Sequence, residues 1–552
     1  MKWINATHLK QWADTRDCQE VLPELILRLI HATSSHISKV KFPSGDSVHL
    51  SGWDGILDNK EKIYCFEPGI SLWEIGSNQN VKNKANDDYE KRRLNSLGYD
   101  KKETIFVFVT PRIWDGAEAW TIEKKAENVW KNIVVLTAIE LEDWLSLCPI
   151  VSLWLAEQLR NIKLSQISTV GSFWQKWSTG KNIVLNPDIL LGGRRKEQDD
   201  LYQRLEMPST VIIQSMAQEE SLAFSVACIL MHPNTQELNS RCIIVRNEDV
   251  LDRLIDEYDN LIFIADVGNK NHTYATQKGH SIIYATSIAE VPKTDKIISL
   301  PLIERDAFIT SLESSGISRD NAEQLSRETV RNITILRRRL GLDYTLPEWA
   351  QAQNIHDLIP SILIGRWNDK VDGDKEILSL IANEPYDSYV RKLHRWLNSN
   401  DTPLVNVDGI WRIISPYDAF TNAANYISSI DFQRFEQVLL YVANDVDPDA
   451  MAKMETSSLA FWENKQKYSG WLKEGIFQSA ILISLLSENI TIMSPQLGNI
   501  WIDNIINSLL QTSNLEWWFS YKHIMPQIAE SSPRSFVSFI NDDLTKDVCI
   551  YH

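Results

Sequence analysis

The chain lacks the cysteine pattern of a zinc site and the long apolar runs of a membrane protein. Only six of its 552 residues are cysteines, and they are scattered without a C-x-x-C pair or a nearby histidine cluster. The longest strongly apolar stretch, around residues 476–486, is too short to cross a bilayer, and the N-terminus does not resemble a signal peptide. We therefore expect a cytoplasmic protein with reduced cysteines and no membrane partner.

An excess of positive charge is also missing. The formal net charge of −17 excludes passive coating of nucleic acid, because phosphate binding needs positive charge. A DNA site must then be a local basic patch, and the best candidate is the segment 80–96 with Lys91, Arg92 and Arg93, followed by Lys101 and Lys102. At about 150 residues per domain, the length predicts three or four domains.

Two carboxylates, Asp54 and Glu74, stand near the ends of consecutive expected strands. Since side chains alternate between the two faces of a strand, each carboxylate shares a face with the apolar residues before it. A buried carboxylate needs a partner. Mg²⁺ is often held by one or two carboxylates, with Mn²⁺ as a second candidate. The lysines that follow, Lys82 and Lys84, could stabilise charge on a scissile phosphate.

Each of these residues also has an ordinary structural explanation. Asp54-Gly55 is a common hairpin-turn dipeptide. Glu74 could lie on the polar side of an edge strand, and the cations of residues 80–96 alternate with acidic residues as on a solvated helix face. It is the order of these features along the chain that favours a site.

The expected element order is a helix, three strands, a helix, and then strands alternating with helices. Apolar periodicity predicts helices over residues 19–34, 80–96, 117–130 and 138–147. Strands are predicted over residues 47–53, 62–66, 70–76, 104–110 and 132–137. This pattern is typical of a mixed sheet between helices.

That order, with Asp54 and Glu74 at the ends of successive strands, resembles the PD-(D/E)XK nuclease superfamily, and within it the Mrr-like restriction endonucleases. The resemblance covers residues 1–165. It implies a metal-dependent DNA endonuclease in which Asp54 and Glu74 hold Mg²⁺, assisted by Glu24 of the first helix.

The chain departs from the family at the lysine that should follow the second acidic residue by two positions. Gly76 stands there instead. The resemblance then implies that the catalytic cation comes from the next helix, with Lys84 as the first choice and Lys82 as the second.

A second region, residues 172–345, follows a tryptophan-rich connector over residues 173–177. Its expected strands, over residues 210–213, 242–245 and 261–266, resemble the NTPase module of AAA+ and STAND ATPases. A P-loop would read G-x-x-x-x-G-K-[ST] after the first strand, but residues 214–221 read QSMAQEES. Only Ser221 and the Walker B-like Asp266 remain as candidates for binding a nucleotide cofactor, so we expect the fold of an NTPase without ATP hydrolysis.

The remaining chain is expected to be mainly helical. Residues 346–430 contain two extended runs joined by Asp408-Gly409, which with the preceding helices predict a winged helix. Since Arg412 is the only basic residue of this wing, a spacer role is favoured. Residues 431–552 predict amphipathic helices, among them 458–467 and 475–487, as at the start of an α-solenoid.

The fold class predicted for the whole chain is thus multidomain α/β plus α, and the order of its parts resembles antiviral STAND proteins of prokaryotic defence systems. The resemblance implies that a phage protein triggers homo-oligomerisation and that the clustered nuclease heads cut double-stranded DNA. One alternative is a catalytically inactive sensor or scaffold, in which the missing lysine and P-loop are signs of degeneration. A third interpretation, a winged-helix DNA-binding regulator, is disfavoured by the acidic charge and by the lack of a basic recognition helix.

Overall fold

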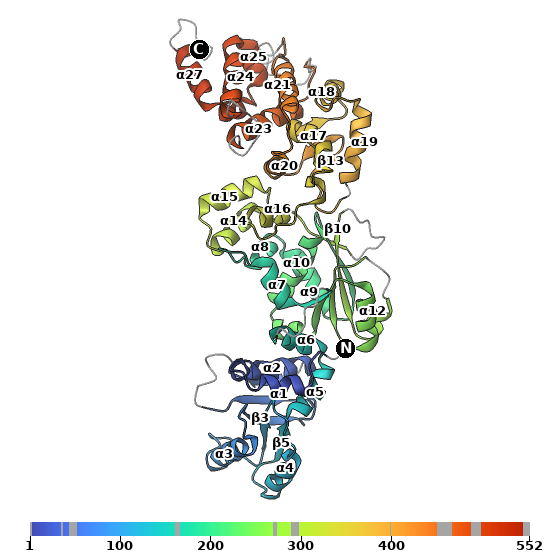
Figure 1. The fold of residues 1–552 in the computed structure, drawn as a ribbon, viewed down its shortest axis with the longest axis vertical. Coiled ribbons are helices and arrows are strands. Elements are labelled where there is room, and N and C mark those ends of the chain that lie inside the picture. Colours follow the sequence, from blue (N-terminus) through green and yellow to red (C-terminus); the bar gives the residue numbers. More distant parts are fainter. Residues whose placement is uncertain are drawn as a thin grey trace.

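The computed structural model describes residues 3–34, 37–43, 52–159, 166–268, 273–288, 297–397, 399–449, 466–486 and 498–544. Within these residues, sheets of five, six and three strands follow one another along the long axis of the molecule, and helices form the end that contains α27 (Figure 1). The predicted mixed α/β class with several sheets is confirmed.

The N-terminal region is built around the five-stranded sheet. Its elements are α1 (Ala6–Trp12), α2 (Asp17–Thr33), β1 (Ile37–Lys41), β2 (Gly55–Asn59), β3 (Gly69–Ile75), α3 (Val81–Leu94), β4 (Thr104–Val109), α4 (Ala117–Ala126), β5 (Asn132–Leu136), α5 (Ala138–Leu147) and α6 (Pro149–Gln158). The strands lie in sequence order, antiparallel from β1 to β3 and parallel from β3 to β5. The four predicted helices and the three later strands of this region are confirmed.

One strand prediction for this region needs correction, and another falls mostly outside the described residues. Residues 62–66 do not form a strand, because the chain turns back on itself and joins Ile63 to Phe66 by an isolated bridge. Both side chains are fully buried, so their apolar character anchors a turn. The strand predicted over residues 47–53 lies mostly outside the described residues, and Asp54 directly precedes β2.

Both faces of this sheet are covered, as the uniformly buried strand β4 requires. On one face, Leu72 and Phe106 pack with Ala85 and Tyr89 of α3. On the other, Trp73 and its neighbours pack with α1, α2, α5 and α6. The helix α3 therefore lies on the face to which Leu72 of β3 points.

The central region contains the six-stranded sheet, ordered β11-β7-β10-β9-β8-β6, in which only β6 is antiparallel to its neighbour. Its elements are β6 (Ile167–Thr169), α7 (Val170–Ser178), α8 (Asp188–Leu191), α9 (Arg195–Leu205), β7 (Thr210–Ser215), α10 (Gln218–Leu230), α11 (Thr235–Arg241), β8 (Cys242–Val245), α12 (Glu248–Glu257), β9 (Ile262–Ala265), α13 (Thr273–Gln277), β10 (Ser281–Ser287), β11 (Ile297–Ser299), α14 (Arg305–Ser314), α15 (Arg319–Glu328) and α16 (Ile333–Arg339). The three predicted strands are confirmed. The tryptophan-rich connector is the amphipathic helix α7, which buries Phe173 and Trp177 against the central core.

The C-terminal region begins with a three-stranded sheet, ordered β12-β14-β13. Its elements are η2 (Glu348–Ala350), η3 (Ile355–Asp357), α17 (Ile359–Ile364), β12 (Arg366–Asn368), α18 (Asp372–Ala382), α19 (Tyr386–Leu397), β13 (Leu404–Val407), β14 (Ile410–Ile413), α20 (Pro416–Ala423), α21 (Ser429–Ala443), α23 (Gly470–Leu486), α24 (Gly498–Thr512), α25 (Leu515–Tyr521), α26 (Met525–Ser531) and α27 (Pro533–Leu544). The predicted hairpin is confirmed: Asp408 and Gly409 join β13 to β14 with φ angles of 53° and 87°, as a type I′ turn requires.

The predicted helix over residues 475–487 corresponds to α23, whereas most of the one predicted over residues 458–467 lies outside the described residues. No helix in the described parts of the chain is long and apolar enough to cross a membrane.

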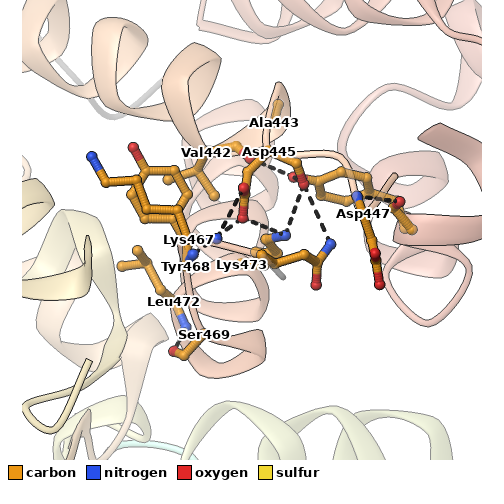
Figure 2. Close-up of polar contacts among 12 residues, drawn as sticks. Val442, Ala443, Asp445, Asp447, Lys467, Tyr468, Ser469, Leu472 and Lys473 are labelled. Atoms are coloured by element: carbon orange, nitrogen blue, oxygen red, sulfur yellow. Dashed lines mark hydrogen bonds and ion pairs between the residues drawn. The ribbon is translucent and has the colours of Figure 1, made fainter. Parts of the chain in front are cut away.

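A buried ion pair fixes the start of α23 (Figure 2). Nζ of Lys473, a residue that is only 2% exposed, lies 3.0 Å from Oδ2 of Asp445 just after α21. The same carboxylate accepts the backbone N–H groups of Lys467 at 3.0 Å and Tyr468 at 3.1 Å. Asp445 thus ties the segment that leads into α23 to the end of α21.

Candidate functional site

The register of β2 and β3 brings the two predicted carboxylates together. Gly55 pairs with Trp73 across this antiparallel pair. The next residues outward, Asp54 and Glu74, therefore stand opposite each other. Opposed residues of an antiparallel pair direct their side chains to the same face, and here that face is the one covered by α3.

The backbone of β3 holds Asp54 in place. The N–H of Ile75 donates to Oδ2 of Asp54 at 2.8 Å. Gly55 does not form a hairpin turn, since it is the first residue of β2. A Cβ atom at this position would instead clash with the ring of Phe42. The Asp-Gly pair is therefore explained by close packing at the start of a strand.

Glu74 is buried beside Arg92 of α3, and the two side chains are 2% and 3% exposed. Arg92 donates through Nε to Oε1 of Glu74 and through Nη2 to the carbonyl oxygen of Gly52. The guanidinium also lies over the ring of Trp53, 4.5 Å from its centroid. Arg92 is thus an internal counter-ion of Glu74. A contact with DNA would require Arg92 to be exposed on the surface, and it is buried instead.

Lys84 lies where a side chain of residue 76 would stand. A Cβ atom added to Gly76 would meet Cγ of Lys84 at 2.9 Å and its Cε at 3.3 Å. Nζ of Lys84 donates to Oδ1 of Asp88 at 2.8 Å, and the Lys84 side chain is 31% exposed. Helix α3 therefore places the partly exposed Lys84 beside Gly76, the position after β3 at which the chain has no lysine of its own.

The cluster combines three carboxylates, Asp54, Glu74 and Asp88, with the cations Lys84 and Arg92. Burial raises the pKa of Glu74 to about 8, and the charges of Asp54 and Asp88 add to this effect while Arg92 opposes it. Burial also raises the pKa of Asp88. Its Oδ2 is buried without a hydrogen-bond partner among the described residues. The cluster is therefore short of positive charge.

A divalent cation fits this shortage of charge and the oxygen ligands on offer. In the described parts of the chain, no three Asp, Glu, His or Cys side chains converge as ligands of one ion. An ion here would depend on one or two carboxylates, Asp54 and Glu74, as Mg²⁺ often does. The guanidinium of Arg92 is its competitor at Glu74.

The predicted helical glutamate, Glu24, lies elsewhere. Its Oε1 accepts hydrogen bonds from Nε and Nη2 of Arg28 at 3.0 and 2.8 Å. Both residues line a cavity of about 310 Å³ together with residues of α6, α7 and α11. The second-choice lysine, Lys82, is exposed in the first turn of α3. Of these three predicted residues, the structure therefore places only Lys84 in the cluster with Asp54 and Glu74.

Exposed cations remain along α3 and the loop that follows it. Lys91 and Arg93 are exposed, and Arg93 pairs with Glu90 at 2.7 Å. Nζ of Lys101 donates to the carbonyl oxygen of Arg93 at 2.5 Å. The basic patch predicted for DNA thus keeps Lys91, Arg93 and Lys101.

The predicted nucleotide-binding residues of the central sheet, Ser221 and Asp266, are both engaged by other groups of the protein. Only Met216 and Ala217 join β7 to α10, too short a loop to wrap around a phosphate in the manner of a P-loop. Ser221 is fully buried and donates to the carbonyl oxygen of Thr286 at 2.8 Å. Glu220, at the position of the P-loop lysine, pairs with the buried Arg194 at 2.6 Å.

Two further groups near this loop, the N–H of Gln218 and the carboxylate of Asp266, also bind side chains of the protein. The N–H of Gln218, in the first turn of α10, donates to Oδ1 of Asn400 at 3.1 Å. Asp266 pairs with Arg246 at 3.0 Å. Asn400 therefore contacts the helix N-terminus, which is the usual phosphate site of such a sheet.

The sequence predicts no basic recognition helix. The helix that precedes the hairpin, α19, nevertheless carries Arg391, Lys392 and Arg395. Lys392 pairs with Glu384 at 2.6 Å and Arg395 with Asp357 at 3.0 Å. These two charges are therefore balanced within the chain.

The sequence prediction missed Asp88 as a member of the cluster and misjudged Arg92. A signal for both was present, since Lys84, Asp88 and Arg92 are spaced four residues apart and so share one face of α3. The charges of this helix alternate in sign, which is the pattern of a solvated face, and the signal was hidden for that reason.

No protein-family model matches the chain, and a search of curated proteins also finds no match.

Proposed function

We propose that the N-terminal region is a metal-dependent DNA endonuclease, the effector of a prokaryotic antiphage protein that works as an oligomer. The observation that carries the proposal is the position of Lys84. Its side chain fills the space next to Gly76, on the sheet face where Asp54 and Glu74 stand opposite each other. Two carboxylates and a lysine are what hydrolysis of a phosphodiester needs.

Each residue has a separate task in this proposal. Asp54 and Glu74 would hold Mg²⁺, which when bound polarises the phosphate and lowers the pKa of water. Lys84 stabilises the negative charge that develops on the phosphate oxygens. The exposed Lys91 and Arg93 and the half-buried Lys101 contact the DNA backbone, which positions the duplex without reading its sequence.

Plasmid cleavage by the full chain tests the proposal, with Mg²⁺, Mn²⁺ or EDTA, and with and without ATP. We expect metal-dependent nicking that ATP does not change. The Glu74→Gln variant abolishes it, and Lys84→Ala lowers the rate about 100-fold, the typical effect of removing one group that stabilises transition-state charge. Lys82→Ala is the matched control on the same helix and leaves the rate unchanged. Cleavage that persists in Glu74→Gln would refute the assignment.

A lysine exchange tests the role of position 76 more directly. In the double variant Gly76→Lys with Lys84→Ala, the new side chain enters the space that Lys84 vacates. We expect the double variant to cleave about tenfold faster than Lys84→Ala alone, which corresponds to about 1.4 kcal/mol of regained transition-state stabilisation. An equal rate would mean that Lys84 does not substitute for a lysine at position 76.

One observation favours a second candidate function, that of an inactive sensor or scaffold. The buried pair of Arg92 with Glu74 neutralises the carboxylate within the chain. Such a protein would bind its partners without turnover, and Mn²⁺ would not change its melting temperature. A metal-dependent rise in melting temperature that is absent from the double variant Asp54→Asn with Glu74→Gln would exclude this alternative.

A further inference from the structure

A third carboxylate takes part in the cluster of Asp54, Glu74 and Lys84. Asp88 is 3% exposed although it lies on a helix whose other acidic residues face the solvent. Its two oxygens differ: Oδ1 accepts a hydrogen bond from Nζ of Lys84 at 2.8 Å, and Oδ2 is buried without a partner among the described residues. Burying a carboxylate in this way costs free energy, so the residue needs an explanation.

Asp88 is suited to fix the direction of the Lys84 side chain. A lysine stem has four rotatable bonds and loses about 2 kcal/mol of rotamer entropy when it is held in one conformation. The stem of Lys84 is confined at both ends, since its Cγ and Cε lie over Gly76 and its Nζ bonds to Asp88. A residue of the strand itself, such as a lysine at position 76, would be placed by the strand without this second anchor.

We propose that Asp88 is a positioning residue that holds Lys84 in the place of the missing lysine at position 76. The effect of Asp88 on catalysis rests on the proposed nuclease function. The pairing of Asp88 with Lys84 can be measured whether or not the protein is a nuclease. Asp88 holds the side chain of Lys84 over Gly76, directly after β3.

The charges around Lys84 determine its protonation. Burial by itself would lower the pKa of Lys84, but the hydrogen bond and charge of Asp88 outweigh that effect, and Glu74 and Asp54 add to them, so the pKa lies above its usual value. The only other cation of the cluster, Arg92, is bound to Glu74. Removing the charge of Asp88 therefore lowers the pKa of Lys84.

Competitive acetylation of lysines tests the pairing. Brief pulses of acetic anhydride between pH 8 and pH 11, read by peptide mass spectrometry, give the rate at Lys84 relative to the exposed Lys82. In Asp88→Asn we expect the rate–pH curve of Lys84 to move to lower pH with the same plateau, so that labelling below the plateau rises about tenfold for each pKa unit lost. Asp87→Asn, an exposed neighbour, is the matched control. An unchanged curve, or a uniform rise that lifts the plateau as well, would overturn the proposal.

Cleavage kinetics test the consequence. Asp88→Asn should lower kcat and shift the alkaline limb of the pH profile to lower pH. In the double variant Gly76→Lys with Lys84→Ala, the same substitution should have no further effect, because no lysine at position 84 remains to be positioned. An equal loss in both backgrounds would overturn the role of Asp88. If no chain cleaves DNA while the acetylation curve shifts, the proposed nuclease function fails and the pairing stands.

Discussion

At position 92 a guanidinium neutralises the buried carboxylate of Glu74, at which we propose that a metal ion binds. Glu74 sits in a buried site that raises its pKa to about 8, so its charge is costly there. Arg92 supplies a positive charge from α3 and is itself held by the carbonyl oxygen of Gly52 and the ring of Trp53. The metal-free state is thereby stabilised by a residue that a metal ion must displace or share.

Replacing Arg92 with Met should therefore have opposite effects with and without metal. Without metal, we expect Arg92→Met to lower the free energy of unfolding by about 3 kcal/mol, because one partner of a buried pair is lost. With Mn²⁺, the rise in melting temperature should be larger than in the wild type, since the ion no longer competes with the guanidinium. Differential scanning calorimetry with a Mn²⁺ titration measures both quantities.

The matched control for this prediction is Arg93→Met, which removes an exposed arginine of the same helix. It should leave both the metal-free stability and the Mn²⁺ response unchanged. If Mn²⁺ raises the melting temperature of Arg92→Met no more than that of the wild type, the guanidinium and the ion do not share a position.

At the scale of elements, what could be predicted depended on local patterns. Alternation along residues 70–76 was enough to place Glu74, and the Asp408-Gly409 turn was identified because a type I′ turn demands those residue types. Patterns failed where tertiary packing decides. Ile63 and Phe66 are apolar because they anchor a turn. Residues 173–177 form a helix that buries Phe173 and Trp177 in the core.

The neighbours of Glu74 were missed for the same reason. The spacing of Lys84, Asp88 and Arg92 puts them on one helix face, but the contact of Arg92 with Glu74, 18 positions away, depends on how α3 packs over the sheet. Asp88 looks like one more charge on a mixed helix face until the structure shows that this face is the buried one.

The start of α23 offers a prediction for an element far from this site. Lys473 is buried beside Asp445 (Figure 2). Its Nζ also lies 4.9 Å from the centroid of the Tyr521 ring. The Lys473→Met variant leaves the carboxylate of Asp445 without its cation, so we expect the free energy of unfolding to fall by about 3 kcal/mol in urea titrations.

The variant Lys467→Met is the control, because Lys467 is an exposed lysine that precedes the same helix and pairs with Glu376 on the surface. Exposed ion pairs contribute little to stability. Equal effects of the two variants would mean that the Asp445–Lys473 pair does not fix the start of α23.

At the scale of the whole molecule, side chains of the C-terminal region contact the central region at the start of α10 and at the end of α16. The first turn of α10 is bound by Asn400, and the adjacent Asp401 pairs with Arg338 at the end of α16. Arg338 also pairs with Asp418 of α20 at 2.7 Å. In a nucleotide-driven switch, contacts between two such regions form or break when the nucleotide binds. Here the side chains of Asn400, Asp401 and Asp418 form the contacts with the central region directly.

Arg338 should therefore determine whether the central and C-terminal regions unfold together. Its side chain is 11% exposed, and its loss leaves Asp401 and Asp418, 17% and 13% exposed, without their shared cation. We expect Arg338→Ala to lower the free energy of unfolding by about 3 kcal/mol. We also expect the two regions to melt in one calorimetric transition in the wild type and in two separate transitions in Arg338→Ala. Arg339→Ala, which removes a more exposed arginine paired with Glu328, should keep the wild-type profile. Because Asn400 contacts the first turn of α10, we expect ATP with Mg²⁺ to leave the melting of the wild type unchanged. Stabilisation of the wild type by ATP would contradict that expectation, and a single unshifted transition in Arg338→Ala would show that Arg338 does not hold the two regions together.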